Sequence, residues 1–219
     1  MKQKQVFLQS EGDAWFTRNQ HAVAIPKLPY DDPILREIID TNINVVKGRK
    51  LRVLEVGCGD GTRLAWLKNN LDADCYGIEP SFKAVEVACA KGVNAQQGTA
   101  NILPYDDLSF DIVIFGFCLY LCDREDLFRI ASEANRVLRM PGWLIILDFY
   151  DPTPSTKDYH HRPGLLSYKM DYRTLFTWHP DYECMTHKVR HHSEGGHTDE
   201  RDEWVAISIL RKHQEALNT

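Results

Sequence analysis

A glycine-rich turn, Gly57-Cys58-Gly59-Asp60-Gly61, follows an apolar run that is typical of a buried β-strand. Glycines in such a turn let the backbone approach a bound ligand closely. Their spacing is G-x-G-x-G, and Thr62 stands where a dinucleotide fingerprint has its third glycine. Glu55 and Asp60 would repel a pyrophosphate and attract a ligand that carries ammonium and sulfonium groups. The turn therefore disfavours a nicotinamide dinucleotide.

A second carboxylate, Glu79, ends the next strand-like run and follows Gly57 by 22 residues. A carboxylate in that place can accept hydrogen bonds from both hydroxyl groups of a ribose. The alternative is that Glu79 is a surface acid at the start of a helix. Together with the cation-favouring turn, Glu79 indicates S-adenosylmethionine as the cofactor.

Candidate proton acceptors gather near the other end of the chain, where eight of the nine histidines lie at or after position 160. A methyl acceptor that must lose a proton needs a base, and histidine changes its charge near neutral pH. His160 and His161, in DYHHRPG (158–164), are the catalytic candidates, with ordinary surface histidines as the alternative. The histidines that we expect only to flank a turn at the sheet edge are His191, His192 and His197.

Alternating strand-like and helix-like segments position these residues. The strand-like runs are 51–56, 75–79, 93–98, 110–117 and 143–149. Between them lie a helix over 62–70, one capped by Ser81, and one capped by Asp123 that ends at 140–142. Apolar strands that alternate with helices predict a parallel sheet covered on both faces.

The flanking regions show other patterns. Helices are predicted over 13–20, 33–46 and 172–178, a long loop over 151–171, and strands over 183–191 and 203–210. The last two strands would add an antiparallel hairpin to the edge of the sheet. We expect one domain, with a helical cap (1–47), a cofactor-binding core (51–149), and a substrate loop, helix and edge strands (150–219).

The core resembles the class I S-adenosylmethionine-dependent methyltransferases, and within them the UbiE-like small-molecule branch. The resemblance is carried by VLEVGCGDG (53–61), YGIEPS (76–81), ANILPYDDLSFDIVIFGFCLYL (100–121) and EANRVLRMPGWLII (133–146). The third is the most specific, because LPY and SFD fill places that this branch commonly keeps. The resemblance implies an α/β fold with a Rossmann-like, seven-stranded, mostly parallel sheet, helices on both faces and an antiparallel C-terminal edge hairpin.

The resemblance also implies cofactor contacts along the carboxyl ends of the strands. They are Glu55, Gly57, Cys58 and Gly59 at the methionine, Glu79 at the ribose with Pro80 and Ser81 beside it, Thr99 and Ala100 at the adenine, and Phe115, Gly116 and Phe117 at the sulfonium side. Thr99 departs from the family pattern, which often has an acid there. The hydroxyl group of Thr99, or the backbone, would have to serve the adenine instead.

Substrate contacts are expected from the flanks and from the segment after the fourth strand. Trp15 and Phe16 would form part of a lid, with Arg18 on the cofactor carboxylate or on an acidic substrate; the alternative is a helix that packs its aromatic rings on the core. The other candidates for substrate contact are Tyr30, Tyr120, Tyr159, Arg162 and Tyr168.

Composition narrows the class of protein. The formal net charge is −5 with no basic region, so we expect no nucleic-acid partner. No apolar run reaches the roughly 20 residues that span a bilayer, and the first residues lack the apolar centre of a signal peptide. A cytoplasmic protein without a membrane partner is the expectation. The six cysteines form no CxxC pair, and no metal site is expected.

The expected reaction is transfer of a methyl group from S-adenosylmethionine, which becomes S-adenosylhomocysteine, to an O, N or C atom of a small molecule such as a sugar, an amine or a natural-product scaffold. The alternatives are an RNA or protein methyltransferase and a non-catalytic S-adenosylmethionine-binding module. FGFCLY follows the fourth strand, where nucleobase enzymes carry N/D-P-P-Y, which disfavours RNA. An antiparallel edge strand can pair with a second copy, so a homodimer is one expected arrangement.

Overall fold

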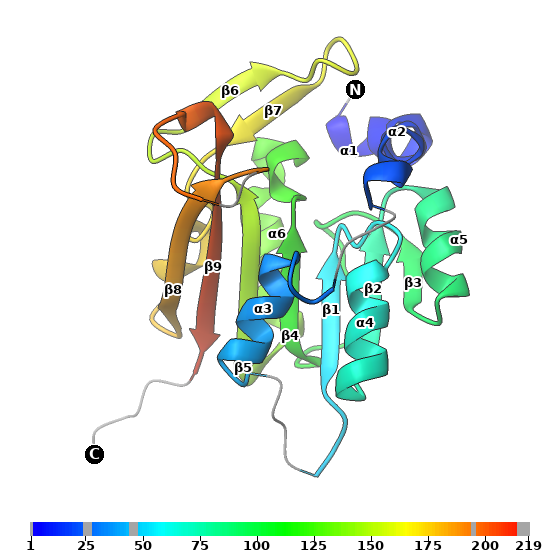
Figure 1. Cartoon of the computed structure of the whole chain (residues 1–219), viewed down its shortest axis with the longest axis vertical. Helices are drawn as coiled ribbons and strands as arrows, with labels where there is room; N and C mark the ends of the chain where they lie inside the picture. Colours follow the sequence, from blue (N-terminus) through cyan, green and yellow to red (C-terminus); the bar gives the residue numbers. More distant parts are fainter. Residues whose placement is uncertain (1, 24–27, 44–47, 194–195, 214–219) are drawn as a thin grey trace.

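The computed structural model describes residues 2–23, 28–43, 48–193 and 196–213. A seven-stranded sheet in the order β3-β2-β1-β4-β5-β9-β8 runs through its centre (Figure 1). The strands are β1 Arg52–Val56, β2 Asp74–Glu79, β3 Asn94–Gln97, β4 Phe110–Gly116, β5 Leu138–Phe149, β8 Tyr182–His191 and β9 Trp204–Lys212. The first five are parallel, β9 is antiparallel to β5, and β8 is antiparallel to β9. This confirms the predicted fold class, including the edge hairpin.

Helices cover both faces of the sheet, because neighbouring strand residues point to opposite sides and both sides are apolar. Ile112 packs in a cluster with α3 (Pro33–Asp40) and α4 (Thr62–Leu71) on one face. Val113 packs in a second cluster with α6 (Leu127–Val137) and α7 (Thr174–Thr177) on the other. Helix α5 (Phe82–Ala90) packs beside β3.

The N-terminal residues form a helical run that passes over the carboxyl ends of the strands (Figure 1). It consists of α1 (Gln3–Val6), the π-helix η1 (Phe7–Glu11) and α2 (Gly12–Val23). The helix predicted over 13–20 is therefore the middle of a longer element. The helix predicted over 33–46 begins as expected, with Asp32 accepting a hydrogen bond from the Leu35 N–H (2.9 Å), but it ends at Asp40. Residues 44–47 lie outside the described part of the chain.

Two predictions for the C-terminal third were too coarse. The expected loop 151–171 contains an antiparallel pair, β6 (Ser155–Asp158) and β7 (Leu166–Lys169). Ser155–Asp158 contains no apolar residue, and the alternation in Leu166–Lys169 covers only four residues, which is too short to mark a strand in the sequence. The helix predicted over 172–178 is regular only over Thr174–Thr177.

Asp123 does not cap the following helix, contrary to the sequence prediction. A short 3-10 turn, η3 (Arg124–Asp126), comes first, and α6 begins at Leu127. The Asp123 carboxylate instead accepts from the N–H groups of Gln3 (2.9 Å) and Lys4 (3.0 Å), at the start of α1. The end of α6 was also misplaced, because β5 begins directly after it at Leu138 and includes residues 140–142.

The other 3-10 turns are η2 (Leu119–Leu121) and η4 (Arg201–Glu203). Within the residues that the structure describes, none of the helices combines the length and the apolar character needed to cross a membrane.

Candidate cofactor and substrate site

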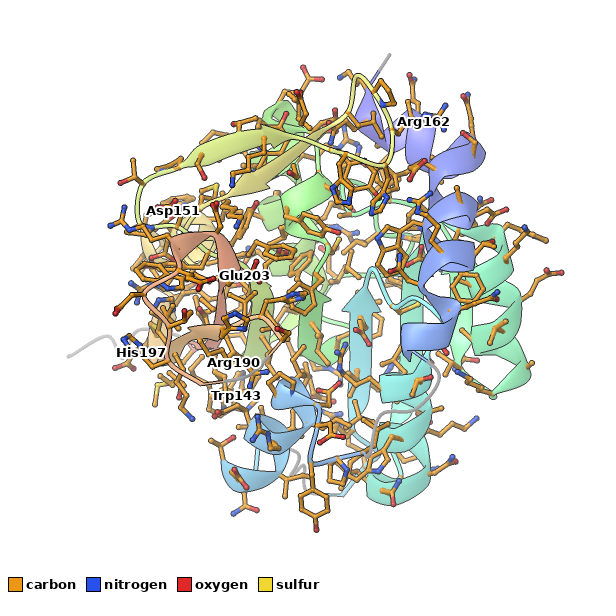
Figure 2. All side chains as sticks on the ribbon, turned by 45° about the horizontal axis from the view of Figure 1, so that its top comes forward. Trp143, Asp151, Arg162, Arg190, His197 and Glu203 are labelled. Carbon is orange, nitrogen blue, oxygen red and sulfur yellow. The ribbon has the colours of Figure 1, made fainter. Side chains whose placement is uncertain are left out.

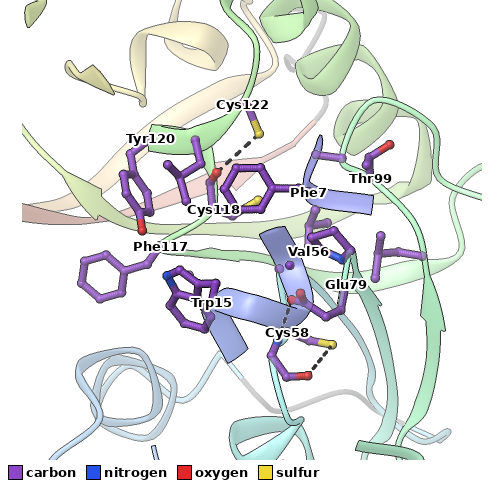
Figure 3. Close-up of a pocket in the computed structure, with 18 of the residues that line it drawn as sticks. Phe7, Trp15, Val56, Cys58, Glu79, Thr99, Phe117, Cys118, Tyr120 and Cys122 are labelled. Atoms are coloured by element: carbon purple, nitrogen blue, oxygen red, sulfur yellow. Dashed lines mark hydrogen bonds between the residues drawn. The ribbon is translucent and has the colours of Figure 1, made fainter. Parts of the chain in front are cut away.

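A cavity of about 770 Å³ opens at the carboxyl ends of β1, β2 and β4, under the N-terminal helices (Figure 3). Its size lies within the range of about 300–1,000 Å³ that small-molecule sites occupy. One half is lined by the glycine turn, the end of β2 and residues 98–101. The other is lined by residues 116–118 and 120–123, by residues 159–161 and 167–169 of the β6–β7 pair, and by Phe149. We call these the glycine half and the aromatic half.

The glycines of the turn serve different purposes. Gly59 has φ +53°, and a Cβ there would meet no atom within 4 Å, so its backbone is open to the cavity that it lines. Gly61 has φ +69°, and a Cβ there would lie 2.8 Å from the Cβ of Ala88. Gly61 therefore allows the start of α4 to pack against α5, whereas Gly59 leaves room for a ligand.

Glu79 ends β2 beneath this turn. Its Oε2 accepts from the N–H of Gly59 (3.0 Å), and its Oε1 accepts from the N–H of Ser81 (2.9 Å). The side chain lines the cavity although it is buried, and burial raises the pKa of Glu79 to about 7. A carboxylate has about four lone-pair positions, so two remain for hydroxyl donors from a ligand.

Glu55 lies at the end of β1, and its Oε1 is ion-paired with Arg63. Arg63 also binds Asp32 (2.9 Å). Burial raises the pKa of Glu55, although the charge of Arg63 opposes this effect. Among the described residues, Glu55 Oε2 is a buried atom without a hydrogen-bond partner. That oxygen is free to accept a hydrogen bond from a cationic group in the cavity.

The remaining predicted cofactor residues divide into two sets. Pro80, Thr99 and Ala100 line the cavity, as do Gly57, Cys58, Gly116 and Phe117. Ser81 and Phe115 do not. Ser81 Oγ accepts from the N–H of Ala84 (3.1 Å) and donates to Asp13 (2.7 Å), and Phe115 is fully buried in the sheet core. Thr99 Oγ1 donates to Asn101 Oδ1 (2.7 Å), which leaves its oxygen lone pairs as acceptors.

The predicted substrate residues lie mostly in the aromatic half. Trp15, Tyr120, Tyr159 and Tyr168 line it. Tyr30 does not, because it stands on the bend before α3 with 77% of its surface exposed.

Both predicted arginines hold the cover of the cavity in place. Arg18 donates to Glu11 (2.5 Å) and to the hydroxyl group of Tyr159 (3.1 Å). Arg162 donates to Ser10 (2.7 Å), and Figure 2 shows it beside the first helices. Neither arginine is part of the cavity lining, so their charges serve contacts between the N-terminal helices and the β6–β7 pair.

Three histidines border the aromatic half. His160 and His161 lie at the β6–β7 turn, both exposed, with ring centroids 3.8 Å apart. Desolvation and the neighbouring charge of His160 lower the pKa of His161. The third is His192, directly after β8, which sequence reasoning assigned to the edge turn. Its local sequence gave no signal of the cavity, because only the pairing of β8 with β9 brings it there.

The segment that forms most of the glycine half is similar to a known protein family. Residues 54–146 match a family model described as a methyltransferase domain. The matched segment contains the glycine turn, Glu79 and the end of β4, and thus most of the glycine half of the cavity.

Named relatives agree with the methyltransferase assignment. The uncharacterised methyltransferase YcgJ of Bacillus subtilis is 34% identical over 116 residues, which cover 49% of this chain and 44% of YcgJ. A demethylmenaquinone methyltransferase of Staphylococcus aureus is 32% identical over 127 residues, which cover 55% of this chain and 51% of that protein. The chain spans about half the length of these curated relatives.

Solved structures share the fold of this chain, and their alignments extend beyond residues 54–146. An S-adenosylmethionine-dependent methyltransferase of Methanosarcina mazei aligns with a TM-score of 0.63 and 17% identity, over 84% of this chain and 98% of that one. The 1,6-didemethyltoxoflavin-N1-methyltransferase of Burkholderia thailandensis, with bound 1,6-didemethyltoxoflavin and S-adenosylhomocysteine, aligns with a TM-score of 0.64 and 14% identity, over 92% and 87%. These solved structures therefore share the fold of this chain.

Proposed function

We propose that the chain binds S-adenosylmethionine in the glycine half of the cavity and transfers its methyl group to an O, N or C atom of a small molecule in the aromatic half. The observation that carries this proposal is the cavity itself. It joins two buried carboxylates, Glu55 and Glu79, to a wall of aromatic and histidine side chains in one continuous space.

The glycine half fits this cofactor in three respects. The unpartnered Glu55 Oε2 can accept from an ammonium group, and Glu79 retains acceptor positions for two ribose hydroxyls. Gly59 leaves space for the ligand to approach the backbone. When bound, the cofactor supplies a methyl carbon that is activated by a sulfonium.

The protein contributes alignment and exclusion of water. The N-terminal helices and the β6–β7 pair cover the aromatic half, and the end of β4 joins the two halves at Gly116. Alignment of two reactants can supply about 7–11 kcal/mol of the barrier to transfer. A side chain is needed as a base only where the acceptor must lose a proton.

Calorimetry with S-adenosylmethionine on the purified chain and on Glu79→Gln tests the cofactor site. We expect Glu79→Gln to weaken binding about 10- to 150-fold at pH 8, because a hydrogen bond to a charged group contributes about 1.5–3 kcal/mol. The ionised Glu79 is the better acceptor, and its pKa is about 7. Affinity should therefore fall as the pH decreases from 8 to 6, and fall less steeply in the variant.

The exposed Glu86→Gln on α5 is the matched control and should bind as the unchanged chain does. No measurable affinity of the unchanged chain would contradict the proposal. The acceptor class is tested with cofactor that carries a labelled methyl group, offered together with separated small-molecule, RNA and protein fractions. Label in the RNA or protein fraction alone would contradict a small-molecule acceptor.

A further inference from the structure

The aromatic half of the cavity contains a compact wall of flat rings. The ring centroids of Phe117 and Phe149 are 5.4 Å apart, and those of Tyr120 and Phe149 are 4.9 Å apart. Figure 3 shows Trp15, Phe117 and Tyr120 gathered on one side of the cavity, across from Glu79. Ring separations of about 4.5–7 Å are those of favourable aromatic pairs, so a flat ligand can join this set by stacking.

His192 is part of the same wall. Its ring lies edge-on to Phe117, with centroids 5.2 Å apart, and tilted against Phe149 at 5.0 Å. The N–H of its backbone donates to the Glu203 carbonyl (2.8 Å), which fixes the residue at the end of the β8–β9 hairpin. The side chain is exposed, and it lines the cavity.

This wall adjoins the place where the methyl group would be offered. Phe117 follows Gly116, and a Cβ at Gly116 would lie 3.1 Å from Glu55 Oε1. Glu55 is the expected partner of the methionine end of the cofactor. His192 contacts the ring of Phe117, and Phe117 directly follows Gly116, where the two halves of the cavity meet.

The charges around His192 suit a neutral imidazole. Desolvation lowers the pKa of His192; the charge of Glu203 opposes this effect, and the charges of His191, Lys169 and Arg190 reinforce it. An imidazole whose pKa lies below the ordinary value of about 6.5 is mostly unprotonated at pH 7 and can accept a proton. The Nζ of Lys169 lies 5.4 Å from the Phe149 ring centroid, so a positive charge stands beside the wall.

We propose that the acceptor is a flat, conjugated molecule with an acidic O–H or N–H group, that it stacks in the wall of Trp15, Phe117, Tyr120 and Phe149, and that His192 takes its proton. This inference rests on the proposed function and names its substrate class. The acceptor oxygen or nitrogen gives its proton to the imidazole and forms a bond to the methyl carbon. The carbon–sulfur bond breaks, and its electron pair stays on sulfur as a thioether.

His192 is a better placed base than the pair predicted from the sequence. His160 and His161 pack on each other and on Tyr159 at the turn of the β6–β7 pair. None of the ring contacts found within the described residues joins either of them to Phe117 or Phe149. His192 contacts both.

The test uses 7-hydroxycoumarin, a flat phenol whose ionised form absorbs at longer wavelength, with the whole chain in the presence and absence of S-adenosylhomocysteine. A protonated His192 beside the bound phenolate should lower the apparent pKa of the probe by about 1 to 3 pH units. His192→Phe, which keeps a ring in the wall, should abolish this change. His197→Gln should leave it intact, because His197 is an exposed histidine of the same hairpin turn and does not line the cavity (Figure 2).

Binding of the probe separates the substrate class from the base. Phe149→Leu should weaken probe binding about 2- to 10-fold and leave the affinity for S-adenosylhomocysteine unchanged. Probe binding no tighter than that of cyclohexanol would overturn the flat acceptor, even where calorimetry establishes the cofactor site. A spectral change that persists in His192→Phe, or that is lost in His160→Ala or His161→Ala instead, would overturn His192 as the base. If only cofactor binding failed, the proposed function would be contradicted. Binding of the probe in the absence of cofactor would still test whether a flat acceptor stacks on the aromatic wall.

Discussion

The sheet core and the cover over the cavity are held by different forces. In the core, β1, β4 and β5 bury apolar side chains on both faces, and residues such as Phe110 and Ile114 are fully buried. The cover consists of the N-terminal run 2–23 and the β6–β7 pair, and we call it the roof. The roof has only a small apolar cluster of its own, with Val6, Phe7 and Tyr159 among its members.

Carboxylates on both sides tie the roof to its surroundings. Asp123 accepts from the N–H groups at the start of α1, and Asp13 accepts from Ser81 Oγ (2.7 Å) and the Lys83 N–H (3.1 Å) at the start of α5. Within the roof, Glu11 binds Arg18 (2.5 Å) of the N-terminal run and the hydroxyl group of Tyr159 (3.3 Å) of the β6–β7 pair. These links are directional, so a single substitution can release one without disturbing the core.

The difference teaches where opening for substrate should occur. Apolar burial contributes about 25 cal/mol for each Å² and accumulates over the whole sheet. Polar links of the roof each contribute on the order of 1 kcal/mol, and segments with such contacts open at lower free energy than the core. The aromatic half of the cavity lies under the roof, and the glycine half is built largely on the core.

The largest expected effect is in the core. Phe110→Ala should lower the free energy of unfolding by about 3–5 kcal/mol, because it removes a fully buried ring that contacts Tyr76 and Tyr105. Urea denaturation measures the change. Phe128→Ala on α6 is the matched control, since Phe128 is 77% exposed, and it should change stability by less than about 0.5 kcal/mol. An equal loss of unfolding free energy in Phe110→Ala and Phe128→Ala would contradict the view that apolar burial holds the core together.

A second effect is expected where the core meets the aromatic half of the cavity. Asp148 is buried at the end of β5, and its carboxylate accepts from the N–H groups of Cys118 (3.1 Å) and Leu119 (2.7 Å), which begin the aromatic half. Burial raises the pKa of Asp148 to about 7 in spite of these hydrogen bonds. The unfolded chain loses this proton at an ordinary pKa of about 4, so the folded state binds more protons between about pH 4 and 7.

The contribution of Asp148 to stability should therefore decrease as the pH rises through that range. The limiting slope is about 1.4 kcal/mol for each pH unit. Urea denaturation at pH 5 and 6.5 should show a loss on the order of 2 kcal/mol in the unchanged chain relative to Asp148→Asn. A constant difference between the two proteins would refute the raised pKa.

The smallest effect is expected in the roof. Glu11→Gln removes the charge that holds Arg18, a side chain with about a third of its surface exposed, so solvent screening limits the contribution to about 1 kcal/mol. Amide hydrogen exchange over 2–23 should become faster, while urea denaturation changes little. Lys2→Gln, which removes an exposed pair with Glu125, should leave exchange unchanged. A lower free energy of global unfolding in Glu11→Gln would show that the roof and the core unfold as one cooperative unit, contrary to the prediction.

The sequence was most informative where structure is local and apolar. The glycine turn, the strand ends at Glu55 and Glu79, and the order of strands and helices over 51–149 were all predicted from spacing and periodicity. Boundaries failed where tertiary contacts replaced local ones, as at Asp123, whose carboxylate serves α1 instead of α6. The β6–β7 pair was missed because each strand has only four residues, too few for a pattern to stand out, and the two meet only by pairing.

By itself, the sequence determined the fold of this protein and indicated the cofactor that we propose, because a buried parallel sheet and a glycine turn flanked by carboxylates are recognisable within a few consecutive residues. Only the tertiary structure decided which side chains line the aromatic half of the cavity. His192 reaches Phe117 across 75 residues of chain, and Arg18 turns to Glu11 and Tyr159 instead of to a ligand. Such long-range contacts depend on strand pairing and on directional hydrogen bonds and ion pairs, which a local sequence pattern does not predict.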